Sequence, residues 1–223
     1  MNTKKLVTTS MLLAAAVMLS LIKLFELPFG GTVTPASMMP VILIAYIYGT
    51  RWGIFSAFVF SILQLVTGMG TVSAFFLPGD NHMPLASAIL ICLIDYIAAY
   101  TVLGFSEMFK SKIKSDMSSL VLGCVFACAL RCIMHIISGA LFFGAWAEWF
   151  FSDSTGLSQI SAFKGFCTWV INRFSGIELS LLYSAIYNLF YMIPETVITI
   201  LAVVPVYRML LKTEPVSGFS QNS

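Results

Sequence analysis

Four ionisable side chains stand out inside long apolar runs: Asp95, Arg131, His135 and Glu195. A charged group in a membrane-spanning helix costs about 2.5–3.5 kcal/mol on insertion scales, so such residues usually face the interior of a helix bundle. Two of the four are acidic, one is basic, and the histidine can be charged or neutral. We therefore expect these residues to mark a buried polar site.

Helix geometry sorts the polar side chains into two depths. With a rise of about 1.5 Å per residue, Arg131 and Glu195 fall in the deeper layer, where they neutralise each other. We predict that they form a structural ion pair that fixes the register of their helices. The shallower layer holds groups suited to binding an organic molecule: Asp95, Tyr96, His135, Tyr187 and Asn188, with Tyr183 nearer the mouth.

The shallower layer combines a carboxylate, hydroxyls, an amide and aromatic rings. No residue near Asp95 in the sequence neutralises its charge. Such a cavity suits a small, flat cation with hydrogen-bonding edges, held partly by cation–π contact. For Tyr183 or Tyr187 taken alone, a place in the aromatic belt at the membrane surface is an equally good explanation.

Three cysteines precede His135 along the same run, at positions 124, 128 and 132. A spacing of four points the sulfur atoms in one direction along a helix but does not converge them on a tetrahedral metal. We interpret these cysteines as small packing residues and predict neither a metal site nor a cofactor.

An intramembrane hydrolase is a competing hypothesis for the same residues. Its candidate groups are His82, His135, Asp95 and Glu195. Their positions argue against it, because His82 falls in a loop whereas Glu195 falls far deeper. We predict no catalytic residues.

Composition indicates the elements that must carry these side chains. Of the 223 residues, 59% are hydrophobic and only 10% are charged, and the mean hydropathy is +0.93. Soluble domains are about 25% charged, so most of this surface must face lipid. These values exclude a disordered chain, a nucleic-acid-binding protein and an ordinary soluble enzyme.

Six apolar runs are candidates to cross the hydrocarbon core, which takes roughly 20 residues of helix. They cover residues 6–25, 37–49, 53–70, 85–109, 119–143 and 181–211, the second being short and therefore tilted or partly re-entrant. The sequence thus predicts an all-α membrane protein with six transmembrane helices in residues 1–212. An outer loop at about 146–180 and a polar C-terminal tail at 213–223 complete it.

The distribution of basic residues predicts the orientation. With six spans, eight basic residues fall on the side of the termini: Lys4, Lys5, Arg51, Lys110, Lys112, Lys114, Arg208 and Lys212. Only Lys23, Lys164 and Arg173 fall on the other side. By the positive-inside rule both termini are cytoplasmic.

Residues 148–178 of the outer loop mix polar residues with large aromatic ones. The aromatic residues are Trp149, Phe163, Phe166 and Trp169. This pattern fits an amphipathic helix lying in the membrane interface, or a lid over an outward pocket. We favour the interfacial helix, because aromatic residues are common at that depth.

Several segments, taken in order, resemble the substrate-binding (S) component of energy-coupling factor (ECF) vitamin transporters, most closely its thiamine-specific members. They are residues 39–43 with 49–53, 95–100 with 103–105, 131 with 135–144, 183–188, and 194–195. Each motif is weak alone, but the ordered set touches five of the six runs. The resemblance implies a multi-pass protein of the bacterial cell membrane that binds a vitamin and is not an enzyme.

The resemblance also implies which residues bind thiamine. Asp95 and Tyr96 match an acidic residue followed by Tyr, with Asp here for the usual Glu. His135 matches the family's histidine, and Phe143 matches an aromatic residue eight positions later that is usually Trp. These matches imply that Asp95 supplies charge or accepts a hydrogen bond, that His135 hydrogen-bonds the ligand, and that Phe143 stacks on it.

Further matches complete the implied site. Tyr183 and Asn188 match a Tyr and an Asn spaced by five, and both would hydrogen-bond the polar edges of the ligand. The family also uses an aromatic residue in its first outer loop, for which Phe29 is a candidate. The Asp and Phe replacements leave an S component for another small vitamin or precursor as the alternative.

The resemblance implies partner subunits as well. In the family, small residues spaced by four in the first span pack on an ECF energising module of a transmembrane coupling subunit and two ATPases. Ser10 and Ala14, or Ala16 and Ser20, have that spacing, which ordinary close helix packing explains equally well. The sequence has no Walker A motif, so another chain must hydrolyse ATP. The predicted partners are thiamine or a similar vitamin, membrane lipid and this module, with no nucleic acid.

Overall fold

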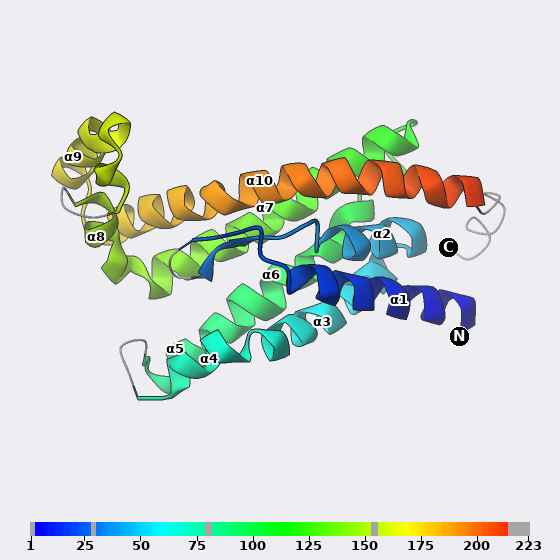
Figure 1. The fold of residues 1–223 in the computed structure, drawn as a ribbon, viewed down its shortest axis with the longest axis horizontal. Helices are drawn as coiled ribbons and strands as arrows, with labels where there is room; N and C mark the ends of the chain where they lie inside the picture. The colour runs from blue at the N-terminus through cyan, green and yellow to red at the C-terminus, as the bar shows by residue number, and fades with distance from the viewer. Residues whose placement is uncertain (1–2, 28–29, 79–81, 153–155, 214–223) are drawn as a thin grey trace.

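The protein is a bundle of helices drawn out along one axis (Figure 1). The computed structural model describes residues 3–27, 30–78, 82–152 and 156–213. The first turn of α1 (Thr3–Ser20) and the last turn of α10 (Gly176–Thr213) lie at the same end of the bundle (Figure 1). We call this end the termini end. The predicted tail lies outside the described residues except for Thr213.

Of the remaining helices, those at 39–48, 50–67, 85–91 and 116–142 follow predicted apolar runs, whereas those at 69–76, 147–151 and 164–173 lie largely outside them. In chain order the helices are α2 (Met39–Tyr48), α3 (Thr50–Thr67), α4 (Met69–Phe76), α5 (Leu85–Ile91), α6 (Ala99–Thr101), α7 (Asp116–Phe142), α8 (Ala147–Phe151) and α9 (Lys164–Arg173). Short 3-10 turns precede α8 and α9: η4 (Gly144–Trp146), η5 (Gly156–Gln159) and η6 (Ser161–Phe163). The last helix, α10, begins at Gly176, inside the predicted outer loop.

Four of the helices are long and apolar enough to cross a membrane, by length and composition, within the described residues. They are Thr50–Thr67, Leu85–Glu107, Asp116–Phe142 and Gly176–Lys212, with Met39–Tyr48 as a shorter apolar helix. α1 has 18 residues but opens on Thr3, Lys4 and Lys5. The predicted count of six spans therefore remains a prediction, whereas the largely helical membrane architecture is confirmed.

The helix that contains Asp95 changes its winding at that residue. α5 passes into a π-helix, η2 (Cys92–Ala98), and then into α6 and a final 3-10 stretch, η3 (Val102–Glu107). Such π-helical turns are rare in proteins, and those that occur are often found at functional sites. Asp95 and Tyr96 both lie within it.

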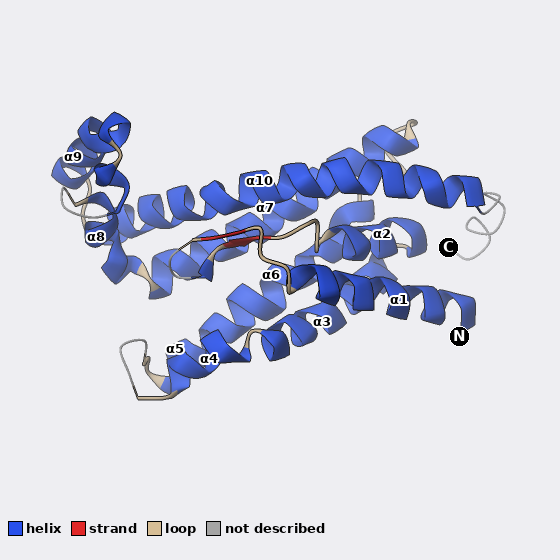
Figure 2. Cartoon of the chain, in the orientation of Figure 1, coloured by secondary structure: helices blue, strands red, loops and turns tan. Residues whose placement is uncertain are grey.

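A small hairpin departs from the all-α expectation. The strands β1 (Phe25–Glu26) and β2 (Thr32–Val33) pair antiparallel, with Phe25 opposite Val33 and Glu26 opposite Thr32 (Figure 2). Two residues per strand are too few for an alternating pattern to show in the sequence. The hairpin connects α1 to α2.

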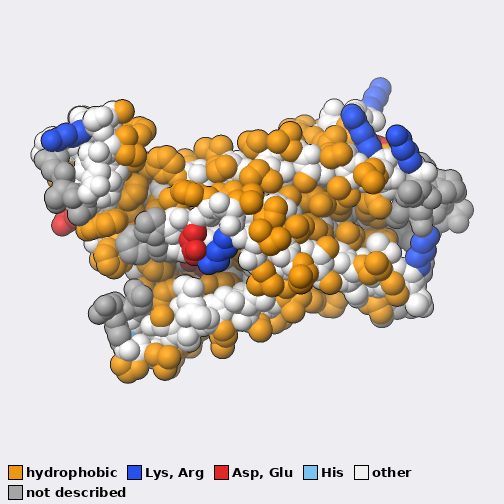
Figure 3. Space-filling view, in the orientation of Figure 1, with side chains coloured by type: hydrophobic (Ala, Val, Ile, Leu, Met, Phe, Trp, Pro, Cys, Tyr) orange, Lys and Arg blue, Asp and Glu red, His pale blue; other side chains and the backbone are white. Residues whose placement is uncertain are grey.

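α2 is the centre of the core. Its residues from Pro40 to Tyr46 are all buried, which explains why it is apolar on every side and short. Large apolar side chains on α1 and α10, such as Met11 and Leu201, are exposed instead. Figure 3 shows hydrophobic surface along the bundle and Lys and Arg side chains gathered at the termini end. This distribution is that of a protein bathed in lipid along its length.

The helices α7 and α10 approach closely through small residues. A Cβ added at Gly139 would clash with Ser184 Oγ, so any larger residue there requires Ser184 to move. The Ser184 hydroxyl in turn donates a hydrogen bond of 2.9 Å to the carbonyl of Ile136. Cys124, Cys128 and Cys132 are buried along α7, as expected for packing residues.

Candidate ligand-binding site

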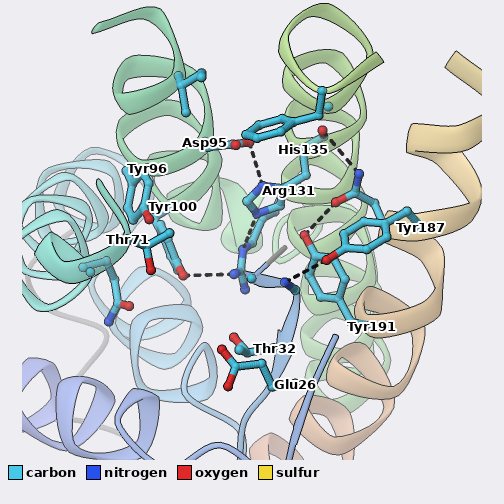
Figure 4. A pocket seen from close by; sticks show the side chains of 18 of the residues that line it. Glu26, Thr32, Thr71, Asp95, Tyr96, Tyr100, Arg131, His135, Tyr187 and Tyr191 are labelled. Atoms are coloured by element: carbon cyan, nitrogen blue, oxygen red, sulfur yellow. Dashed lines mark hydrogen bonds and ion pairs between the residues drawn. The ribbon is translucent and has the colours of Figure 1, made fainter. Parts of the chain in front are cut away.

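A cavity of about 480 Å³ lies in the half of the bundle away from the termini end. Its walls come from the hairpin, from α3 and α4, from η2, and from the facing parts of α7 and α10 (Figure 4). All seven residues predicted to bind the ligand line it: Asp95, Tyr96, His135, Phe143, Tyr183, Tyr187 and Asn188. The seven residues chosen from the sequence therefore come from three separate helices and line one cavity.

A chain of polar contacts crosses the cavity wall from Asp95 to Arg131. Asp95 Oδ1 lies 3.0 Å from His135 Nδ1, and Arg131 Nε donates to His135 Nε2 over 3.3 Å. Because arginine only donates, Nε2 is the acceptor, and the proton of a neutral ring sits on Nδ1, facing Asp95. Asp95 Oδ2 has no hydrogen bond within the described part of the chain, so it is available to a ligand.

Arg131 belongs to the cavity wall, where it contacts Tyr100. Its Nη2 donates to the Tyr100 hydroxyl over 3.0 Å, and its guanidinium lies 4.3 Å from the centre of the same ring. The predicted ion pair between Arg131 and Glu195 is wrong, because no such pair within 4.0 Å occurs among the described residues. Arg131 instead donates hydrogen bonds to the Tyr100 hydroxyl and to the His135 imidazole.

Glu195 is bound by a residue of the first loop. Its Oε2 accepts from the backbone N–H of Thr34 and its Oε1 from the Thr34 hydroxyl, both over 2.6 Å. The N–H of Ser37 donates to the same hydroxyl oxygen over 3.2 Å. Glu195 is only 1% exposed and does not line the cavity. Its role is therefore to hold the segment between the hairpin and α2.

Tyrosines spaced by four on α10 form one side of the cavity. Tyr183, Tyr187 and Tyr191 follow one another with ring centres 5.9 and 6.2 Å apart. The Tyr187 hydroxyl accepts from the N–H of Gly31 over 3.1 Å. A Cβ on Gly31 would lie 2.7 Å from Tyr191, so glycine is required where the hairpin meets α10.

Asn188 lies in the wall with its amide already engaged. Its Nδ2 donates to the carbonyl of Ser184 over 2.8 Å and also lies 3.1 Å from the Ser184 hydroxyl. Its Oδ1 accepts from the Tyr191 hydroxyl over 2.7 Å. Even without a ligand, Asn188 therefore orients Tyr191. Its Nδ2 also contacts the carbonyl of His135, which links α10 to α7.

Aromatic rings close the cavity at the end away from Arg131. Phe143, at the end of α7, meets Phe75 of α4 with ring centres 6.1 Å apart. Tyr96 of η2 lines the cavity and packs on Gly68, where a Cβ would come within 3.0 Å of its ring. These rings offer faces and edges to a flat ligand.

The two pairs of small residues on α1 have different environments. Ser10 and Ala14 are exposed on one face of the helix. Ala16 is fully buried, and Ser20 lines the cavity and accepts from Gln64 Nε2 over 2.8 Å. The prediction that Ala16 and Ser20 contact a partner subunit is wrong, because both face the bundle. The other pair remains a prediction.

Several cavity residues escaped the sequence analysis. Tyr100 and Tyr191 each follow a predicted residue by four positions, so the helical spacing was a usable signal. Gln64, Thr71 and Phe75 had none, since α4 has no ionisable residue and Arg51, the ionisable residue of α3, lies at the far end of that helix. Lys23 and Glu26, paired over 2.7 Å, belong to the hairpin. The candidate Phe29 lies outside the described residues.

A family model described as thiamine transporter protein (Thia_YuaJ) matches residues 6–152. The chain belongs to this thiamine transporter family. The thiamine transporter ThiT of Bacillus subtilis (strain 168) is 27% identical over 205 residues, covering 87% of this chain and 85% of that protein. Members of the family are transporters and not enzymes, and this chain is a multi-pass bacterial membrane protein.

A solved structure agrees at the level of the fold. The structure of ThiT from Listeria monocytogenes matches with a TM-score of 0.56 and 22% identity, over 95% of this chain and 94% of that one. A structure described as the S component of a bacterial ECF transporter has a TM-score of 0.48 and 20% identity, over 94% and 96%. The first of these shows that the family fold is shared.

Proposed function

We propose that this chain is the S component of an ECF-type transporter and that it captures thiamine in the cavity between η2, α7 and α10. One observation supports this most strongly. Seven residues chosen from the sequence for a thiamine site, on three helices, line a single cavity. Its volume of about 480 Å³ falls in the range of small-molecule sites, about 300–1,000 Å³.

Thiamine joins a flat aminopyrimidine ring to a cationic thiazolium ring. The free Oδ2 of Asp95 accepts a hydrogen bond from the amino group of the ligand, while His135 holds Oδ1 in place. Phe143 and Phe75 give a ring face to the thiazolium cation. The hydroxyls of Tyr183 and Tyr187 bind polar edges.

The charges around the cavity balance in the absence of a ligand. Asp95 is offset by Arg131 through His135, and Glu26 is paired with Lys23. A cation such as thiamine therefore depends on ring faces and on Asp95 together. The sequence had led us to expect an uncompensated carboxylate at Asp95. Because its charge is offset, aromatic contacts contribute the larger part of the binding free energy.

The proposed orientation places both termini in the cytoplasm and the cavity toward the outside. The basic residues at the termini end support it through the positive-inside rule. A coupling subunit would pack on the exposed face of α1 around Ser10 and Ala14, with two ATPases supplying the energy. The cavity then releases thiamine inward when these partners reorient the protein.

A thermal-shift panel tests the proposed ligand. The detergent-purified chain is heated with thiamine, riboflavin, biotin, and the separate pyrimidine and thiazole halves of thiamine. A ligand that binds the folded state raises the melting temperature with its concentration. Stabilisation by thiamine above the other vitamins supports the proposal. Stabilisation by another vitamin and not by thiamine replaces it with the alternative S component.

A further inference from the structure

Residues 144–152 and 156–175 form an aromatic cap on the bundle, at the end opposite the termini end (Figure 1). The described part of the cap has its own small core, which includes Phe151, Cys167 and Val170 and packs against Leu179 of α10. Phe150 meets the cavity residue Tyr183 edge to face, with ring centres 5.2 Å apart. The cap is thus a folded part of the protein that covers the ends of α7 and α10.

One face of α9 and its approach is aromatic and exposed. Phe163, Phe166 and Trp169 recur every three residues, so they share a face of the helical segment. They are 39%, 39% and 55% exposed. The residues that α9 buries, Cys167 and Val170, point into the cap core instead. Exposed aromatic surface of this kind marks an interaction site.

These rings continue into the lipid-facing side of the bundle. Ring centres of Phe166 and Trp169 lie 6.2 Å apart, and those of Trp169 and Phe174 lie 5.5 Å apart. Phe174 lies two residues before α10, where Ile177 is 58% exposed and Leu181 is also exposed. The aromatic face therefore joins the apolar surface that α10 presents along its length.

Helix length places the cap at the level of the lipid head groups. The 27 residues of α7 span about 40 Å, and the 38 of α10 about 57 Å, whereas the hydrocarbon core is about 30 Å thick. Both helices are therefore long enough to extend beyond the core at the end where the cap begins. An aromatic side chain with a polar N–H, such as Trp169, is favoured at that depth.

Two basic residues bracket α9. Lys164 opens it and Arg173 closes it, and both are exposed. Such side chains reach from a helix lying in the membrane surface to lipid phosphates. Thr168 and Asn172 lie on the side of α9 away from Phe166, and both are exposed polar residues that suit contact with water.

We infer that α9 is a membrane-interface anchor: its face of Phe163, Phe166 and Trp169 lies among phospholipid head groups, with Lys164 and Arg173 on their phosphates. The anchor holds the cap, and with it Phe150 against Tyr183, at a fixed height beside the cavity. This inference rests on the membrane placement of the bundle and not on the identity of the transported vitamin.

Fluorescence of Trp169 tests the anchor. Trp52, Trp146 and Trp149 are replaced by Phe, and the chain is reconstituted in phosphatidylcholine–phosphatidylglycerol vesicles. We expect Trp169 to be quenched strongly by lipids brominated high on the acyl chain and weakly by aqueous iodide. A matched control moves the probe one residue, with Thr168→Trp and Trp169→Phe, and we expect the opposite preference there.

The outcomes separate the possible occupants of this face. Iodide quenching of Trp169 equal to that of the control, without quenching by brominated lipid, overturns the anchor in favour of water or a protein partner. Lipid quenching of both probes overturns the assignment of the aromatic face. If the multiple replacement prevents folding, the difference in quenching between the unmodified chain and Trp169→Phe alone gives the same comparison.

Discussion

Glu195 holds Thr34 by two hydrogen bonds of 2.6 Å, one from the backbone N–H and one from the hydroxyl, across 161 positions of sequence. Three residues earlier, Gly31 donates its N–H to Tyr187. α10 therefore fixes the first loop at two points, one beside the cavity and one below it. The hairpin wall of the cavity is therefore held in place by the Glu195 carboxylate, which does not itself line the cavity.

Removing the Glu195 carboxylate should loosen that wall. Glu195→Ala leaves the buried N–H of Thr34 without its acceptor, at a cost of about 1–3 kcal/mol. We expect a lower melting temperature and weaker thiamine binding, with Glu195→Gln intermediate because its carbonyl still accepts one hydrogen bond. Thermal unfolding and calorimetric titration measure both effects. Glu178→Ala, exposed in the first turn of the same helix, is the control. Equal stability of Glu195→Ala and this control would contradict the account.

Asp95 should matter through its charge. Asp95→Asn keeps the size of the side chain but weakens hydrogen bonds that a charged acceptor makes, worth about 1.5–3 kcal/mol each. We therefore expect thiamine affinity to fall about 10- to 100-fold, measured by titration calorimetry. Asp116→Asn, which removes an exposed carboxylate at the other end of the bundle, should leave the affinity unchanged. An equal loss in both variants would show that the effect is not local.

The partner of Arg131 can be determined by comparing two double-mutant cycles. One combines Arg131→Gln with Tyr100→Phe, and the other combines Arg131→Gln with Glu195→Gln. Because Arg131 bonds the Tyr100 hydroxyl directly, the first cycle should give the larger coupling energy in thermal or denaturant unfolding. A larger coupling between Arg131 and Glu195 would restore the ion pair predicted from the sequence.

The contact between the hairpin and α10 should not tolerate a side chain at Gly31. In Gly31→Ala the new methyl group would lie 2.7 Å from Tyr191 Cδ1 and 3.1 Å from the Tyr187 hydroxyl. We expect the hairpin to shift and thiamine binding to weaken several-fold, as measured by titration. Gly165→Ala adds the same methyl group to open space on α9 and should have no such effect. Normal binding by Gly31→Ala would mean that the hairpin does not form part of the site.

The sequence was sufficient to predict the helices and most of the cavity. Residues three or four apart share a helix face, so Tyr183 and Tyr187 could be grouped without coordinates. Asn188 was placed beside them by its depth and by the family resemblance. Charged residues in apolar runs marked Asp95 and His135 as inward-facing.

What the sequence did not reveal depends on long-range contacts of loops. Thr34 and Gly31 sit in a segment without periodicity, so nothing linked them to Glu195 and Tyr187. Arg131 and Glu195 fell at similar depths, but depth does not determine which way two side chains turn. The π winding at Asp95 likewise has no signature in the order of its residues.

Calorimetric titration of the purified protein with thiamine tests the central claim most directly, beside Asp95→Ala and His135→Ala. The account predicts a nanomolar-to-micromolar dissociation constant for the unmodified chain and loss of binding in both variants, because the two side chains form one contact in one cavity. Unchanged affinity in both variants would contradict it.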